Sequence, residues 1–208
     1  MEESGAVTDR EILSRHSTHV APLVLGASLV SIVDGAEVRL RITEVEAYGG
    51  VGEDPGSHAY RRLTPRNATM FGPSGHAYVY FTYGMHWCFN IVTEVKGVAG
   101  AVLVRAGEVT GGLESARARR GPSVPERDLA RGPARLTVAL AITGVQDGVD
   151  LLSPGSPLRL EGLRQEALPH QTGPRTGVGG LGSLTPWRFH LPDEPTVSRY
   201  RPAARRRS

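Results

Sequence analysis

The chain has 208 residues, of which 39% are hydrophobic and 22% are charged, and its net charge is +3. This length fits one domain with its own hydrophobic core, and a single cysteine excludes a disulfide framework or a multi-cysteine metal site and fits a reducing compartment. No apolar run reaches the length of about 18 residues that a membrane span needs. The acidic first residues do not resemble a secretory signal, so we expect a cytoplasmic protein.

The basic residues are unevenly distributed in type and in position. Lys96 is the only lysine among 24 basic residues. Codon use in a GC-rich genome accounts for such a bias, but a Schiff-base mechanism needs an amine, and this chain offers almost none. Between residues 61 and 135, eleven Lys and Arg stand against five Asp and Glu, which suggests a polyanionic partner.

The predicted elements are short, as expected for a chain with 26 Gly and 15 Pro. A capping box begins at Thr8, and turn signals lie at Asp34-Gly35 and Tyr83-Gly84. In chain order we predict a helix from residue 8, a helix at 22–26, strands at 38–48, 77–82, 89–93 and 100–105, helices at 113–120 and 132–142, and strands at 158–160, 177–179 and 187–191. The pattern is a mixed α+β domain at 8–201, with residues 1–7 and 202–208 disordered.

The predicted strand at 38–48 has an unusual face. Its even-numbered positions begin apolar and end with Glu44, Glu46 and Tyr48, and a core-facing row seldom ends in glutamates without a partner or a function. Either the strand leaves the core and the glutamates are solvated, or they form a site. His58 follows in a loop, where it is a surface residue or joins the glutamates in a metal site, although the spacing matches no zinc signature.

Aromatic residues concentrate between residues 78 and 87, where five rings occur within ten positions. They form either a core strand or a stacking surface for bases, with Tyr83 as a wedge at the tip of a hairpin. Arg105 ends an apolar strand, where it needs an acidic partner or an anion. Residues 177–182 match G-x-G-x-x-G, but Pro186 prevents a long following helix and no βαβ unit fits, which excludes a dinucleotide site.

Taken together, these segments resemble the alkyladenine (3-methyladenine) DNA glycosylases, in their bacterial branch. The resemblance runs in order from about residue 15 to residue 200. It is carried by Glu44-Val45-Glu46-Ala47-Tyr48, Ser57-His58-Ala59, Thr64-Pro65-Arg66-Asn67, Met70-Phe71, Tyr78-Val79-Tyr80, Tyr83-Gly84-Met85, Asn90, Val102-Leu103-Val104-Arg105-Ala106, Gly132-Pro133-Ala134-Arg135-Leu136 and Arg175-Thr176-Gly177-Val178.

The resemblance implies a single α+β domain with a curved antiparallel sheet, short flanking helices and a protruding hairpin. It also implies a monofunctional glycosylase that flips a damaged purine out of duplex DNA and hydrolyses its N-glycosidic bond, leaving an abasic site. The substrates would be 3-methyladenine and 7-methylguanine, with hypoxanthine or ethenoadenine as further candidates. Glu46 would activate the water, Arg105 would help to hold it, and Tyr83 would fill the gap in the duplex.

The same resemblance assigns the remaining site residues. Tyr48, His58 and Tyr80 match the rings that sandwich the flipped base, and Asn90 matches the pocket residue that excludes the amino group of guanine. Three further positions match loops near the DNA backbone, namely Arg66, Gly132 and Arg175. We expect a monomer in the bacterial nucleoid that binds double-stranded DNA and uses no cofactor and no metal.

Electrostatics supports these roles on independent grounds. A 3- or 7-alkylated purine is a cation, which aromatic rings attract. The sugar becomes positively charged as its bond to the base breaks, and a carboxylate stabilises that charge.

Two alternatives remain open. A non-catalytic module that binds damaged nucleic acid would need the aromatic pocket but not Glu46 and Arg105. A metal hydrolase would use Glu44, Glu46 and His58. Because Lys96 lies outside every matched motif, we expect base excision without strand cleavage.

Overall fold

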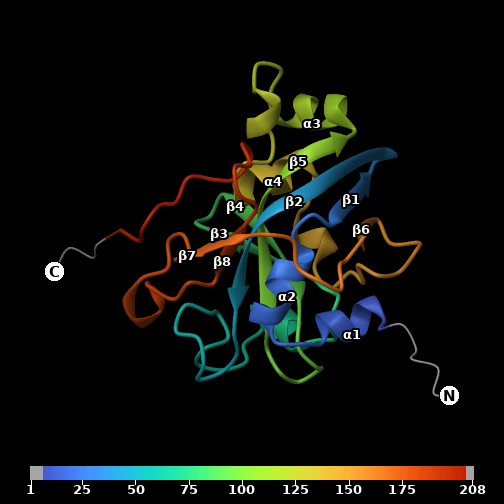
Figure 1. Cartoon of the computed structure of the whole chain (residues 1–208). Coiled ribbons are helices and arrows are strands. Elements are labelled where there is room, and N and C mark those ends of the chain that lie inside the picture. Colours follow the sequence, from blue (N-terminus) through green and yellow to red (C-terminus); the bar gives the residue numbers. More distant parts are fainter. Residues whose placement is uncertain (1–6, 205–208) are drawn as a thin grey trace.

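A computed structural model describes residues 7–204 of the chain (Figure 1). Within that range the chain forms four α-helices and eight strands. The helices are α1 (Asp9–Leu13), α2 (Ser17–Val24), α3 (Leu113–Arg120) and α4 (Pro133–Ala139). The strands are β1 (Ser28–Val33), β2 (Ala36–Tyr48), β3 (Ala77–Thr82), β4 (His86–Val92), β5 (Ala101–Gly111), β6 (Leu158–Glu161), β7 (Gln171–Gly173) and β8 (Arg188–His190). The predicted α+β class with a curled antiparallel sheet is confirmed.

All the paired strands run antiparallel and belong to one sheet. Its main path is β3-β4-β5-β2-β1-β6, and β8 pairs with both β2 and β7. The long strand β2 lies in the middle of this path, as Figure 1 shows. Its first half pairs with β1, and its residues 44–46 pair with β8, while β5 accompanies it over most of its length. The strand therefore changes one of its neighbours halfway along.

Two tight turns shape the sheet as their sequences predict. Asp34 and Gly35 join β1 to β2 with φ values of 53° and 75°, and Tyr83 and Gly84 join β3 to β4 with φ values of 52° and 67°. Positive φ at both central residues suits the right-handed twist of the flanking strands. The second turn forms the tip of the β3–β4 hairpin, which places Tyr83 at its end.

The core lies on one face of the sheet. Helix α2 packs against β2 and β5, and α4 packs against β4 and β5. Residues from four strands supply the apolar side chains of this face: Val38, Leu40, Ile42, Val45, Ala47, Val79, Phe89, Ile91, Val102 and Val104. The alternate positions of the same strands point to the opposite face, which is where the polar and aromatic residues of the predicted site lie.

The face of β2 that points to the core changes at its midpoint. Val38, Leu40 and Ile42 join the core, and after register shifts on both sides of Glu44 the core residues are Val45 and Ala47. A β-bulge inserts one residue and so reverses the alternation. Our expectation that the glutamates continue the apolar face is therefore wrong, because the bulge turns them to the opposite face. They are not solvated either, since both have no exposed surface.

Several predicted boundaries differ from the structure. Helix α2 begins at Ser17, not at Pro22. His16, the residue before Ser17, caps the helix because its ring nitrogen accepts the N–H of Thr18. Helix α4 ends at Ala139, and the chain then turns through Ala141 at a φ of 53°. The prediction for residues 113–120 is confirmed.

Two strand predictions need correction. Residues 177–179 are not a strand, since β7 lies at Gln171–Gly173 and a 3-10 turn follows at Gly180–Gly182. Strand β5 continues to Gly111, six residues beyond Arg105, because it pairs with β2 as far back as Arg39. The predicted disorder at 1–7 and 202–208 falls mostly outside the described residues. Among residues 7–204 no helix is long and apolar enough to cross a membrane.

Candidate active site

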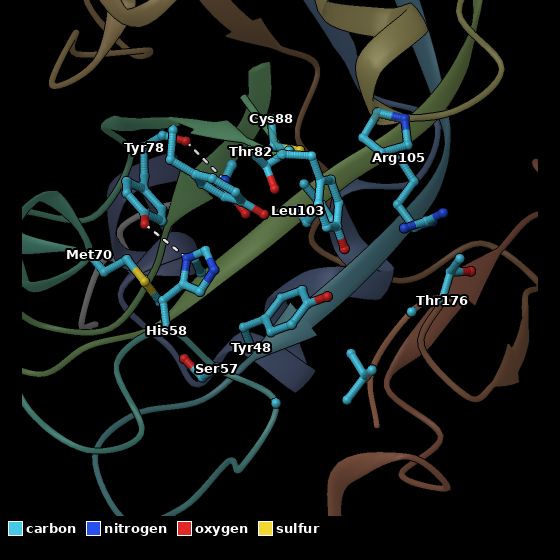
Figure 2. A pocket seen from close by; sticks show the side chains of 18 residues that line it. Tyr48, Ser57, His58, Met70, Tyr78, Thr82, Cys88, Leu103, Arg105 and Thr176 are labelled. Carbon is cyan, nitrogen blue, oxygen red and sulfur yellow. Dashed lines mark hydrogen bonds between the residues drawn. The ribbon is translucent and has the colours of Figure 1, made fainter. Parts of the chain in front are cut away.

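A cavity of about 330 Å³ opens on the sheet face opposite the core (Figure 2). Strand alternation explains its lining, because residues two apart on one strand share a face. Four neighbouring strands contribute Tyr48 of β2, Tyr78, Tyr80 and Thr82 of β3, Cys88 and Asn90 of β4, and Ala101, Leu103 and Arg105 of β5. Loops close the cavity with His58, Thr176 and Val178, among others, and the first residue of α4, Pro133, also lines it.

Aromatic rings form one wall of the cavity. The His58 and Tyr80 rings meet edge to face with centroids 4.6 Å apart, and the Tyr78 and Tyr80 centroids lie 5.3 Å apart. His58 Nδ1 lies 3.2 Å from the Tyr78 hydroxyl, a contact that Figure 2 marks. Burial, with a smaller contribution from the charge of Arg66, lowers the pKa of His58. The imidazole is therefore neutral at pH 7.

Two further groups that line the cavity, Cys88 and Tyr48, are also held in their neutral forms. Burial raises the pKa of the Cys88 thiol, and burial together with the charge of Glu46 raises that of the Tyr48 hydroxyl. Asn90 is buried and donates its side-chain N–H to the Tyr78 carbonyl at 3.0 Å, which fixes the amide at the cavity wall.

Glu46 lies directly behind the cavity wall. Its side chain has no exposed surface, and it accepts three hydrogen bonds. Oε1 accepts the backbone N–H of Thr176 at 2.6 Å, while Oε2 accepts the Tyr48 hydroxyl at 2.8 Å and Arg105 Nη1 at 3.2 Å. All three donor residues line the cavity and can be followed in Figure 2. Since a carboxylate has about four acceptor positions, Oε1 keeps one free.

Glu44 occupies the next position on the same face and is also fully buried. Its Oε1 accepts Arg105 Nε at 2.9 Å and Arg188 Nε at 2.6 Å. Ser198 donates its backbone N–H at 2.7 Å and its hydroxyl at 3.0 Å. Burial alone would raise the pKa of Glu44, but the two guanidinium groups outweigh it and the pKa is lowered. Arg105 thus bridges both glutamates.

The sequence interpretation missed Arg188 and Ser198. Arg188 stands between Trp187 and Phe189 in a predicted strand, which is the same signal that singled out Arg105 at the end of an apolar run. That signal identifies an arginine in need of an acidic partner. Ser198 lies in an irregular segment after β8, and its sequence context carries no such signal.

Arg175, which was predicted to lie near the DNA backbone, is enclosed in the structure. Its side chain has no exposed surface and forms a two-pronged ion pair with Asp54, at 2.5 and 2.7 Å. Nη1 also donates to the Ala47 carbonyl at 2.9 Å. Enclosed in this way, the guanidinium has no surface open to a phosphate, and its contact with DNA stays a prediction. The same guanidinium joins the loop after β2 to the segment that carries Thr176.

The other predicted DNA contacts lie at the surface. Tyr83 is 85% exposed at the hairpin tip. Arg66 is exposed beside the hairpin, where Nη2 donates to the Phe81 carbonyl at 3.2 Å. Gly132 adopts a φ of 119° immediately before Pro133, which lines the cavity. These three contacts stay predictions.

A metal site built on Glu44, Glu46 and His58 is not supported. Glu44 is held by arginines and a serine, and His58 contacts Tyr78. Across residues 7–204 no group of three or more His, Cys, Asp or Glu side chains is placed to hold a metal ion.

Comparison with known proteins identifies one family. Residues 11–195 match the family model described as "Methylpurine-DNA glycosylase (MPG)". Two similar proteins are each named "Putative 3-methyladenine DNA glycosylase". One, from Streptomyces avermitilis, is 50% identical over 95% of this chain and 93% of its own length, and the other, from Leifsonia xyli, is 51% identical over 92% of both chains. The chain therefore belongs to the methylpurine-DNA glycosylase family, whose members are enzymes that act on DNA.

Proposed function

We propose that this protein is a monofunctional glycosylase that flips a damaged purine out of duplex DNA into the cavity and hydrolyses its N-glycosidic bond. The observation that carries the proposal is the position of Glu46, which is held by three donors at the wall of an aromatic cavity. Cationic 3-methyladenine and 7-methylguanine are the proposed substrates, with hypoxanthine and ethenoadenine as neutral candidates.

In the proposed reaction Glu46 acts as the general base. Its free acceptor position on Oε1 takes a proton from the attacking water, whose oxygen bonds to C1′ of the sugar. The electron pair of the breaking C1′–N bond leaves with the purine. Because Glu46 has no exposed surface, the water must pass Tyr48, Arg105 or Thr176. The negative charge of Glu46 also stabilises the cationic sugar as the bond breaks.

The aromatic wall supports recognition of a cationic base. Tyr48, His58 and Tyr80 present rings that attract a positively charged purine, and the neutral state of His58 removes a competing charge. A cationic purine leaves as a neutral molecule and needs no acid. Asn90, held by the Tyr78 carbonyl, is positioned at the wall where it would exclude the exocyclic amino group of guanine.

Base flipping is assigned to the β3–β4 hairpin. Extrusion of a nucleotide costs a few kcal/mol, with the lowest cost at damaged pairs, and an inserted ring offsets the lost stacking. Tyr83 is the ring at the hairpin tip and is almost fully exposed. Arg66 beside the hairpin and the turn at Gly132 are the proposed contacts to the DNA backbone. We propose that the protein works as a monomer on the DNA of the bacterial nucleoid.

Excision without strand cleavage is the second part of the proposal. Strand cleavage by a glycosylase needs an amine that attacks the sugar. No lysine lines the part of the cavity that the structure describes, and Lys96 is exposed in the loop between β4 and β5. Treatment with borohydride should trap no covalent protein–DNA adduct, and a trapped adduct would contradict this part.

Glu46→Gln tests the mechanism. The variant should bind a duplex with hypoxanthine or ethenoadenine, as a gel shift measures, but should release no base. Abasic sites are detected as strand breaks after alkali. Glu108→Gln, at an exposed glutamate that pairs with Arg41, is the control and should act like the wild type. Release by Glu46→Gln at the wild-type rate would refute the mechanism, and no breaks with the wild type would favour the non-catalytic module.

A further inference from the structure

An arginine lies behind the aromatic wall of the cavity. Arg175 Cζ is 4.7 Å from the centroid of the Tyr48 ring and 5.2 Å from that of Trp187. Tyr48 lines the cavity and points into it in Figure 2, whereas Arg175 does not line it and has no exposed surface. The guanidinium therefore stacks on the Tyr48 ring from the side away from the cavity.

One carboxylate balances the charge of this arginine. Asp54 is buried, pairs with both terminal nitrogens of Arg175, and accepts the backbone N–H groups of Gly49 at 3.1 Å and Gly56 at 2.9 Å. Arg175 Nε has no hydrogen-bond partner, although it is buried. The two other buried carboxylates nearby, Glu44 and Glu46, bind Arg105 and Arg188 instead. Asp54 is thus the only acidic partner of Arg175 among the described residues.

The charge state of this pair acts on anything that stacks on the cavity side of Tyr48. A base in van der Waals contact with that side would lie roughly 8 Å from the guanidinium, since stacked groups are about 3.5 Å apart. Charges at this distance interact appreciably in a protein interior, where water screens them little. An unbalanced Arg175 would repel a cationic purine and would have little effect on a neutral one.

We propose that the Arg175–Asp54 pair is a positioning element that holds Tyr48 and, by its electrical neutrality, sets the preference of the cavity for cationic over neutral purines. The inference rests on the proposed function, because it concerns the base that enters the same cavity. If the pair acts in this way, the preference for cationic over neutral purines depends on the sign of the charge behind Tyr48. A purely structural role of the pair would show no such dependence.

Two single variants change the net charge behind the ring, and a double variant returns it to zero. Asp54→Asn leaves Arg175 unbalanced and adds one positive charge. Arg175→Gln leaves Asp54 with its two backbone donors and adds one negative charge, and the double variant is neutral. Glu108→Gln adds the same positive charge as Asp54→Asn at an exposed position, so it controls for the general attraction of DNA.

Each variant is titrated with duplexes that carry 7-methylguanine, a cation, or hypoxanthine, which is neutral, and base release is measured in single turnover. The affinity for 7-methylguanine divided by the affinity for hypoxanthine should fall at least ten-fold in Asp54→Asn. The same ratio should rise in Arg175→Gln. In the double variant and in Glu108→Gln it should stay within about three-fold of the wild type. If Asp54→Asn does not fold by circular dichroism, the comparison of Arg175→Gln with the double variant decides.

Equal losses for both lesions in every variant would overturn the inference and leave the pair a purely structural element. This outcome is distinct from failure of the proposed function. If the wild type binds both lesions but releases neither base, the catalytic proposal fails, while the affinity ratio still tests the pair. If bases are released and the ratio of the two affinities does not change with the sign of the charge behind Tyr48, the function stands and the inference fails.

Discussion

The buried cluster around Glu44 gives a quantitative prediction for Glu44→Gln. Glu44 has no exposed surface and pairs with two arginines, Arg105 and Arg188, whose side chains are only 7% and 8% exposed. Removal of one charge from a buried ion pair typically costs about 3–5 kcal/mol, because the partner is left uncompensated. A domain of this size has a free energy of unfolding of about 5–15 kcal/mol, so the variant should lose a large part of its stability.

Urea and thermal unfolding measure this loss. For a domain of this size each kcal/mol lowers Tm by about 2–4 °C, so we expect Tm to fall by about 6–20 °C. The midpoint in urea should fall with an unchanged slope, since the surface that unfolding exposes stays the same. Base release is measured below the new Tm, so that loss of folding and loss of activity are separated.

Glu161→Gln is the matched control. Glu161 also pairs with two arginines, Arg39 at 2.6 Å and Arg159 at 3.1 Å, but its side chain is 39% exposed. Water screens such a pair, and its contribution is about 0–1 kcal/mol. If Glu44→Gln and Glu161→Gln cost the same free energy, burial does not decide the strength of these clusters and the reasoning is refuted.

The pH dependence gives an independent check on the same residue. The pKa of Glu44 in the folded protein lies below its ordinary value of 4.5, because Arg105 and Arg188 together outweigh the effect of burial. Its stabilisation is therefore complete above pH 4.5 and is lost as the pH falls through the folded pKa. The difference in stability between wild type and Glu44→Gln should shrink over that acid range. A difference that stays constant down to pH 2 would contradict the assignment.

Three further outcomes are expected. Tyr83→Ala should weaken binding to a lesion duplex by about 1–3 kcal/mol, the usual value of one stacked ring, without a change in Tm, and an equal loss on single-stranded DNA would contradict a wedge. Burial and Arg66 lower the pKa of His58 below 6.5, so its ring gains a proton only as the pH falls under that value. The affinity for 7-methylguanine should therefore drop in that acid range, and His58→Asn should abolish the drop. Gly107→Ala should lower the free energy of unfolding in urea by about 1–3 kcal/mol, because the added Cβ would lie 2.5 Å from a carbonyl oxygen of β2. Gly155→Ala, with open space around its Cβ, should leave that free energy nearly unchanged.

Local sequence patterns predicted the parts of the fold that depend on neighbouring residues. The turns at Asp34-Gly35 and Tyr83-Gly84 need positive φ, and their residues tolerate it. Apolar alternation located β3 at residues 77–82. The pattern failed at 177–179, where glycines and one valine imitate a strand but no partner strand lies beside them. Pairing with a neighbour, and not local propensity, decides whether so short a segment is a strand.

The bulge in β2 shows why the orientation of the glutamates could not be predicted. Strict alternation placed Glu44 and Glu46 on the apolar face, but β2 changes its partner from β1 to β8 at this point and its register against β5 shifts. The shift is a consequence of the sheet topology. A single strand sequence holds no information on where its neighbours end.

By itself the sequence determined the fold class, the tight turns, the aromatic hairpin and, through its resemblance to a family, the residues proposed for the cavity. Only the tertiary structure decided that Glu44 is balanced by Arg105 and Arg188, that Ser198 joins them, and that Arg175 is enclosed behind Tyr48. The partners in these contacts are 144 residues apart for Arg188 and Glu44 and 121 for Arg175 and Asp54. Turn dihedrals and side-chain alternation are set by adjacent residues, whereas buried ion pairs depend on which distant strands the completed sheet places side by side.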